Sequence, residues 1–117
     1  MTGQDERLRR IAINDPTFLE RILVADPSMV ERLAPHDQAL VRIGVLVALD
    51  GPSSAFEYAT SAALAAGASP DELVDVLIAT APLVGSAHVV SAAPRLARAL
   101  GYDLDADLEG AHLGPRV

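Results

Sequence analysis

The sequence predicts an all-α fold, a compact helical bundle of about four main helices preceded by two short ones. Half of its 117 residues are hydrophobic but only 3% are aromatic. The apolar side chains are therefore mainly those of Ala, Val, Leu and Ile, which suit closely packed helices. Proline and glycine stand at positions where helices typically start and stop. The length fits one compact domain.

Four long helices are bounded by these start and stop residues. They are predicted over residues 35–49, 53–66, 70–83 and 86–100. The segment Ser69–Glu72 has the form of a capping box with proline at the first helical position, and Gly67 is the natural left-handed stop of the helix before it. We therefore expect the second and third helices to form an antiparallel pair with a very short link. Gly101 closes the last helix, and Pro94 should kink or split it.

The N-terminal third contains a short internal repeat. The segments "DPTFLERIL" (15–23) and "DPSMVERLA" (26–34) match nearly position for position, each with an Asp N-cap followed by Pro. We expect two short amphipathic helices, too short to be stable alone, that serve either as a packing collar over the main helices or as a peptide-binding lip. The chain accordingly divides into an N-terminal extension (1–34), a helical core (35–101) and a tail (102–117).

The helix predicted over residues 53–66 is rich in alanine. On a helical period, four alanines fall along one stripe: Ala55, Ala59, Ala62 and Ala66. Such a stripe lets a second helix approach closely, because no side chain projects beyond a methyl group. We expect a tight seam against the aliphatic helices around residues 41–49 and 73–83.

Charge and composition exclude several functions. The formal net charge is -7 and the longest basic cluster is Arg7–Arg10, which argues against nucleic-acid binding. The sequence has no cysteine, so disulfides, thiolate nucleophiles and Cys-zinc sites are excluded. A high aliphatic content in a short chain favours a homo-oligomer that covers one face of each subunit.

The stretch over residues 76–94 carries no formal charge and is long enough for a membrane span. Pro82, Gly85 and Ser86 interrupt it, so we interpret it as two buried helices that meet at a break, and we expect no membrane insertion. The N-terminus, "MTGQDERLRR", lacks the apolar core of a signal peptide. We therefore expect a cytoplasmic protein.

Residues 62–100, "AALAAGASPDELVDVLIATAPLVGSAHVVSAAPRLARAL", combine four features in a fixed order. They are an Ala-Leu-x-x-Gly-Ala segment, an acidic helix start with Glu-Leu, a glycine after an apolar helix, and a final alanine-rich helix. This segment resembles the second half of the carboxymuconolactone decarboxylase and AhpD-like family, and "LAPHDQALVRIGVLVAL" (33–49) resembles its preceding helix. The resemblance implies an all-α AhpD-like bundle, usually a trimer or hexamer, with a small pocket near the subunit contacts.

The family's reactive residues have no counterparts in this sequence. AhpD-like members use a Cys-x-x-Cys pair, a histidine four residues later and a glutamate on the previous helix. The matching positions are Pro52 and Ala55 for the cysteines, Ala59 for the histidine, and Ala39 or Leu40 for the glutamate. The resemblance therefore implies a non-redox protein without thiol peroxidase activity, and the decarboxylase mechanism of the family lacks its histidine.

Four polar residues are candidates for a site. Tyr58 and His88 are candidate catalytic residues, because Tyr58 adjoins the empty histidine position and His88 lies in the first turn of the last helix. Arg42 and Glu57 are candidate substrate-binding residues. Each has a structural alternative: Tyr58 at an interface, His88 as a structural histidine, Glu57 in solvent, and Arg42 paired with Asp50 or Glu57 rather than with a ligand carboxylate.

No metal site or cofactor is predicted. The three histidines, His36, His88 and His112, share no helical face, which makes a metal centre improbable. Phosphate-binding and dinucleotide-binding motifs are absent from the sequence.

Two functional hypotheses remain open, so the sequence leaves open whether the protein is an enzyme. In the first, the protein binds, or acts as a lyase or decarboxylase on, a small cyclic or carboxylate metabolite without a cofactor. In the second, it is a catalytically inactive family member that serves as an oligomeric assembly or interaction module.

Overall fold

A computed structural model describes residues 2–24 and 27–102, and all regular secondary structure in those residues is helical. The predicted all-α fold is confirmed. The chain divides into two compact units, Met1–Leu33 and Ala34–Val117, and we describe each separately.

The first unit contains α1 (Gly3–Ala12), α2 (Pro16–Leu23) and a 3₁₀ turn, η1 (Pro27–Met29). Helix α1 was not predicted, although Thr2 and Asp5 form a capping box at its start: each side chain accepts a hydrogen bond from the other residue's backbone N–H, at 3.2 and 3.3 Å. The T-x-x-D spacing is the signal that marks this start. Helix α2 begins as expected, with the Asp15 carboxylate accepting from the Thr17 N–H at 3.0 Å.

The prediction of a second helix from the repeat is wrong, because residues 27–29 form a single 3₁₀ turn. Burial distinguishes the two copies. Phe18 of α2 is buried and lies under the Arg10 guanidinium, 5.9 Å from the ring centroid, whereas its counterpart Met29 is only half-buried. Short helices depend on tertiary packing for their stability, and the second copy has less of it.

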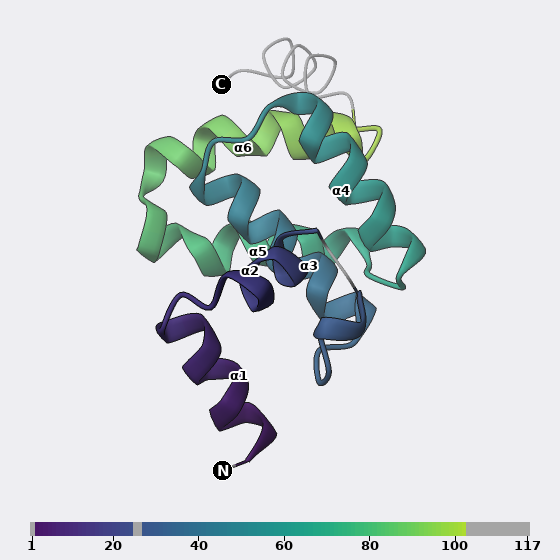
Figure 1. Cartoon of the computed structure of the whole chain (residues 1–117). Helices are drawn as coiled ribbons and strands as arrows, with labels where there is room; N and C mark the ends of the chain where they lie inside the picture. Colours follow the sequence, from purple (N-terminus) through teal and green to yellow (C-terminus); the bar gives the residue numbers. More distant parts are fainter. Residues whose placement is uncertain (1, 25–26, 103–117) are drawn as a thin grey trace, which may run out of the picture. The chain divides into compact units, whose positions relative to one another are not determined.

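The second unit is a bundle of four helices whose bounds lie within one or two residues of the predicted ones. They are α3 (Pro35–Ala48), α4 (Ser53–Ala65), α5 (Pro70–Val84) and α6 (Ser86–Ala99). Helices α3 and α6 each pack against both α4 and α5, and α3 and α6 also meet across the centre (Figure 1). The expected antiparallel pair is wrong: α4 packs chiefly against α3 and α6, not α5.

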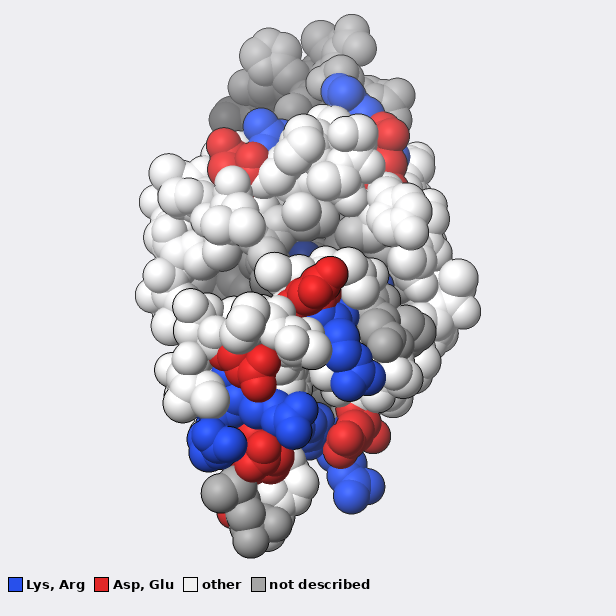
Figure 2. Space-filling view, in the orientation of Figure 1, with Lys and Arg blue, Asp and Glu red and all other residues white. Residues whose placement is uncertain are grey.

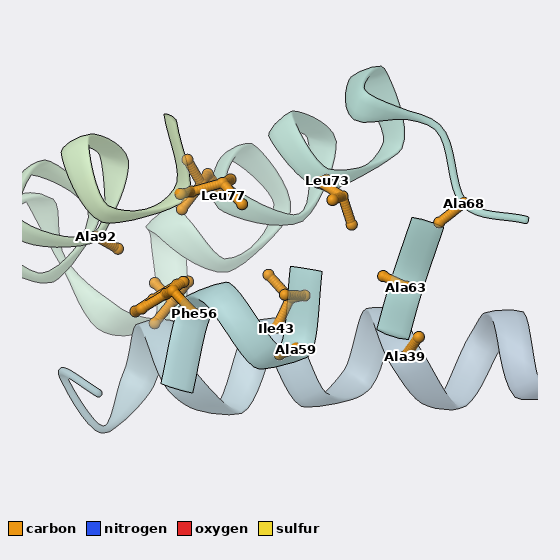
Figure 3. Close-up of a cluster of buried hydrophobic side chains, with 11 residues drawn as sticks. Ala39, Ile43, Phe56, Ala59, Ala63, Ala68, Leu73, Leu77 and Ala92 are labelled. Atoms are coloured by element: carbon orange, nitrogen blue, oxygen red, sulfur yellow. The ribbon is translucent and has the colours of Figure 1, made fainter. Parts of the chain in front are cut away.

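The core of this unit combines a few large side chains with many alanines (Figure 3). Ile43, Phe56 and Leu73 are fully buried between the helices. The predicted alanine seam is confirmed against α3 but not against α5, and its buried face is rotated around α4. Its buried face consists of Phe56, Ala59, Thr60 and Ala63, while Ala55, Ala62 and Ala66 are only half-buried. The bulk of Phe56 explains the rotation, because burying one aromatic ring removes more apolar area from water than burying a methyl group.

The predicted helix ends are largely confirmed. Ser69 and Glu72 form the capping box, with hydrogen bonds of 2.9 and 3.1 Å, and Gly67 follows α4 with a φ of +96°. Gly85, with a φ of +87°, separates α5 from α6. The predicted split at Pro94 is wrong, because α6 is continuous from Ser86 to Ala99. Pro94 is exposed, so water can bond the carbonyl left without an N–H partner.

None of the described helices is both long and apolar enough to cross a lipid bilayer.

Candidate functional site

A groove of about 320 Å³ lies between α3 and α4. Its lining residues are Arg42, Val45, Leu46, Ala55, Tyr58 and Ala59. The walls are apolar, and the polar groups along them are one guanidinium and one phenol. This volume is at the small end of the range for ligand pockets, which begins at roughly 300 Å³. We call this feature the α3–α4 groove.

Helical spacing brings these side chains to one place. Ala55, Tyr58 and Ala59 are three and four residues apart, so they share a face of α4. Ala55 and Ala59 are the positions at which the AhpD-like pattern places its second cysteine and its histidine. The structure therefore places both on the groove wall, where each presents only a methyl group. Tyr58 stands at the rim, with 78% of its surface exposed.

Arg42 has no hydrogen bond or ion pair with any residue in the described part of the chain. The sequence left open whether it pairs with Asp50 or Glu57, and neither pair forms, since the Asp50 carboxylate is bonded to α6 instead. Glu57 is exposed and does not line the groove. The guanidinium of Arg42, with its five N–H donors, is therefore left to solvent at the edge of an apolar groove.

His88 lies elsewhere on the bundle. It is half-buried in the first turn of α6 and is not among the residues that line the α3–α4 groove. The pKa of Asp50 is lowered, first by the hydrogen bond from Ser91, then by Arg95 and, least of all, by the charge of His88. The structure brings Arg42 and Tyr58 together and leaves His88 and Glu57 apart from them.

A second polar cluster ties this turn to α6. The Asp50 carboxylate accepts hydrogen bonds from the Ser91 hydroxyl at 2.7 Å and from Arg95 Nη1 at 2.8 Å. The same Nη1 donates to the Gly51 carbonyl at 2.7 Å. We call Asp50, Ser91 and Arg95 the Asp50 clamp. The sequence analysis missed it, because Asp50 is 41 and 45 residues away from Ser91 and Arg95 and no local motif joins them.

A third cluster joins the starts of α3 and α5. One ring nitrogen of His36 lies 2.9 Å from an Asp37 carboxylate oxygen, and the other lies 2.8 Å from Glu72. These contacts raise the pKa of His36, Asp37 contributing most and Glu72 next. The pKa of Glu72 is lowered, first by the backbone N–H of Ser69 and then by His36. The sequence analysis considered His36 only as a possible metal ligand, whereas in the structure it links two helices.

A larger groove, of about 550 Å³, runs between α5 and α6. Its walls include Val74, Leu77, Leu96, Leu100 and Tyr102, and Asp71 is the one charged side chain among its described lining residues. It is an apolar surface without a converging set of polar groups, which a specific small-molecule site requires.

No group of three or more His, Asp or Glu residues in the described part of the chain is placed to hold a metal ion. His112 lies outside the described residues.

The fold and the groove together define the class of protein. It is a small all-α bundle with a groove between two of its four core helices, α3 and α4. Residues 18–99 match the model of the carboxymuconolactone decarboxylase family, so the chain belongs to this family. It is a divergent member, because it has no cysteine and carries alanine at the histidine position. No curated protein and no solved structure matches the chain.

Proposed function

We propose that this carboxymuconolactone decarboxylase-like protein binds a small, mostly apolar carboxylate in the α3–α4 groove, without redox chemistry and without a cofactor. The observation that carries the proposal is the guanidinium of Arg42, which has no partner among residues 2–24 and 27–102, beside a groove whose other walls are apolar. We also propose that the protein is cytoplasmic, as the sequence analysis expects.

The chemistry of the lining favours this class of ligand. A guanidinium presents parallel N–H donors that match both oxygens of a carboxylate. Val45 and Leu46 offer aliphatic contact from α3, and the methyl groups of Ala55 and Ala59 leave room for a flat ring. The Tyr58 hydroxyl can donate a further hydrogen bond at the rim. A small cyclic or aromatic acid combines these complementary features.

Binding fits the groove better than a lyase or decarboxylase reaction does. Proton transfer requires a positioned group with a pKa near the working pH, and histidine is the usual one. The groove wall carries Ala59 at the family's histidine position, and His88 does not line the groove. The catalytic roles predicted for Tyr58 and His88 would therefore require a change of geometry on ligand binding.

A thermal-shift titration tests the proposal. Small lactones, muconate-like diacids and aromatic monoacids would be titrated against the protein, with their uncharged amides as controls. A ligand at about a hundred times its Kd should stabilise the folded state by roughly 2.7 kcal/mol. We expect a saturable shift with an acid that its amide does not reproduce.

Two arginine variants localise the effect. Arg42→Gln should remove the shift, whereas Arg98→Gln should retain it, because Arg98 is an exposed arginine of α6 that does not line the groove. Equal loss in both variants would indicate a general effect of charge, and no shift with any acid in the wild type would refute the proposal.

An assembly module is the second candidate function, and one observation favours it. Large apolar side chains are exposed on all four core helices, including Val41 at 55%, Leu64 at 40%, Leu83 at 88% and Val90 at 69%. In Figure 2 the charged side chains gather mainly over the N-terminal helices and near one end, and much of the remaining visible surface is uncharged. A homo-oligomer, a trimer or hexamer by family resemblance, would cover part of this surface.

A further inference from the structure

The Asp50 clamp touches the backbone that supports one wall of the α3–α4 groove. The Gly51 N–H donates to the Leu46 carbonyl at 2.9 Å, and the Gly51 carbonyl accepts from Arg95 at 2.7 Å. A methyl group added at Gly51 would lie 2.8 Å from Leu46 Cδ2, so the Leu46 side chain rests directly against Gly51. Leu46 in turn lines the groove. An unbroken path of contacts therefore runs from α6 to the groove wall.

The turn at the centre of this path is closed by its own backbone and held further from α6. Asp50 has a φ of +53°, the left-handed region that Asp adopts more readily than most residues other than glycine. The Asp50 N–H donates to the Val47 carbonyl at 3.4 Å and the Gly51 N–H donates to the Leu46 carbonyl at 2.9 Å, as in a common helix C-terminal turn. Arg95 adds contacts from α6: its Nη1 reaches the Asp50 carboxylate, the Gly51 carbonyl and, at 3.4 Å, the Asp50 carbonyl.

We infer that Arg95 is a positioning residue for the α3–α4 groove: from α6 it holds the turn after α3, fixes Leu46 through Gly51, and so sets the width of the groove. The inference rests on the proposed function in that it concerns the same groove. It adds that ligand size is selected by a residue that does not touch the ligand. Leu46 affects the width because Ala55 and Ala59 of α4 line the groove with methyl groups alone, while the larger Tyr58 stands at the exposed rim.

The first test compares Arg95→Gln with Arg98→Gln, a matched loss of charge on the same helix outside the clamp. The methyl resonances of Leu46 would be recorded by NMR well below the melting temperature. We expect them to move in Arg95→Gln and to stay at their wild-type positions in Arg98→Gln. This readout needs no ligand, so it decides the inference even if the proposed function fails.

The second readout is the ratio of affinities for benzoate and 2-naphthoate, two acids of different width. One methylene of misfit in an apolar pocket changes affinity by about tenfold or more. We therefore expect Arg95→Gln to change this ratio by about fivefold or more, and Arg98→Gln to leave it unchanged. If the wild type binds neither acid, the proposed function fails, and the Leu46 resonances alone decide the role of Arg95.

Gly51→Ala provides a variant that leaves the clamp residues in place. The atom nearest to the added methyl group is Leu46 Cδ2, the movable end of that side chain, and the backbone Cα of Leu46 lies at an ordinary contact distance of 3.6 Å, so the protein should fold with Leu46 displaced. We expect shifted Leu46 resonances and an altered affinity ratio at nearly wild-type stability. A lower melting temperature in Arg95→Gln with unchanged Leu46 resonances and an unchanged ratio would overturn the inference, because Arg95 would then only stabilise the bundle.

Discussion

At the scale of single residues, the site is defined by small side chains on α4 and one charged side chain on α3. Ala55 and Ala59 occupy the positions of the family's thiol and imidazole groups, so the groove has room but no nucleophile or base on that wall. Arg42 is a guanidinium without a protein partner among the described residues. This combination recognises an anion and does not by itself transform it.

Thr60 is a second residue-scale feature, because its hydroxyl is buried without a hydrogen-bond partner in the described structure. Replacing it with valine keeps the shape and removes the desolvated hydroxyl. We expect Thr60→Val to raise the free energy of unfolding by about 1 kcal/mol, the lower end of the cost of an unpaired buried polar group. Urea unfolding would measure the change.

Thr60→Ser is the control, because it keeps the hydroxyl and removes a buried methyl group. It should destabilise the protein by about 1 kcal/mol. If valine destabilises the protein as serine does, the Thr60 hydroxyl has a partner in solution and our account of this position is wrong.

The sequence predicted some of the residues that line the groove, but not the contacts between residues far apart in the chain. Ala55 and Ala59 were placed on one stripe of a helix, and Arg42 and Tyr58 were named as candidate site residues. The contacts of Arg95 with Asp50 and of His36 with Glu72 join residues 45 and 36 positions apart. Local periodicity carries no information on which distant polar groups meet, so these clusters required the structure.

At the scale of helices, the ends were predictable and the packing was not. Proline, glycine and serine fixed the bounds of α3 to α6 within one or two residues. They did not determine that α4 packs against α6 rather than α5, because neighbouring helices in a sequence can cross as well as pair. The second repeat was predicted wrongly as a helix because the local sequence does not show how much of it is buried. The split that was one of the two alternatives at Pro94 does not occur, because α6 continues past this residue.

The capping box at the start of α5 gives a direct test at this scale. Ser69→Ala removes the hydroxyl that accepts the Glu72 N–H at 3.1 Å. We expect the free energy of unfolding to fall by about 1 kcal/mol, the usual cost of losing an N-cap. The control is Ser61→Ala, at an exposed position within α4, and it should have little effect in thermal unfolding. Equal effects of the two substitutions would show that the cap contributes nothing.

The contact of His36 with Asp37 and Glu72 makes the stability of the α3–α5 junction dependent on pH. Because the pKa of His36 is raised above 6.5 in the folded state, its contribution is complete below that value and is lost as the pH rises through the folded pKa. The lowered pKa of Glu72 means that this residue's contribution is present above 4.5 and is lost as the pH falls through its own folded pKa.

Urea midpoints measured from about pH 5.5 to about pH 8.5, the range in which histidines titrate, would test this dependence. The wild type should lose stability as the pH rises across this range. His36→Gln should show a smaller decline, whereas Ser61→Ala, at an exposed position of α4 that does not titrate, should keep the wild-type decline. A His36→Gln curve parallel to that of the wild type would contradict the assignment.

At the scale of the whole molecule, exposed apolar surface is the dominant feature. Large apolar side chains are mostly exposed on two helices, at Ile78 and Leu83 of α5 and at Val90 of α6. A short chain has a large surface for its volume, so a second subunit is a means of covering these side chains. We expect the protein to form a homo-oligomer, and light scattering should give a mass that is a multiple of the subunit mass.

A charge placed on this surface should disrupt the oligomer. We expect Ile78→Glu to yield smaller particles at a given concentration, while Ser61→Glu, at an exposed position of α4, should not. Retained helical circular dichroism would show that the variant is folded. A monomeric wild type would remove the support for the assembly module and leave ligand binding as the better account.

The central claim is that a small carboxylate binds between α3 and α4. The most direct measurement is a methyl NMR titration of the protein, labelled at valine and leucine, with benzoate. We predict saturable shifts of the Val45 and Leu46 methyl resonances, with those of Val74 and Leu100 in the α5–α6 groove unchanged. Shifts confined to the α5–α6 groove, or no saturable shift at any methyl group, would contradict the claim.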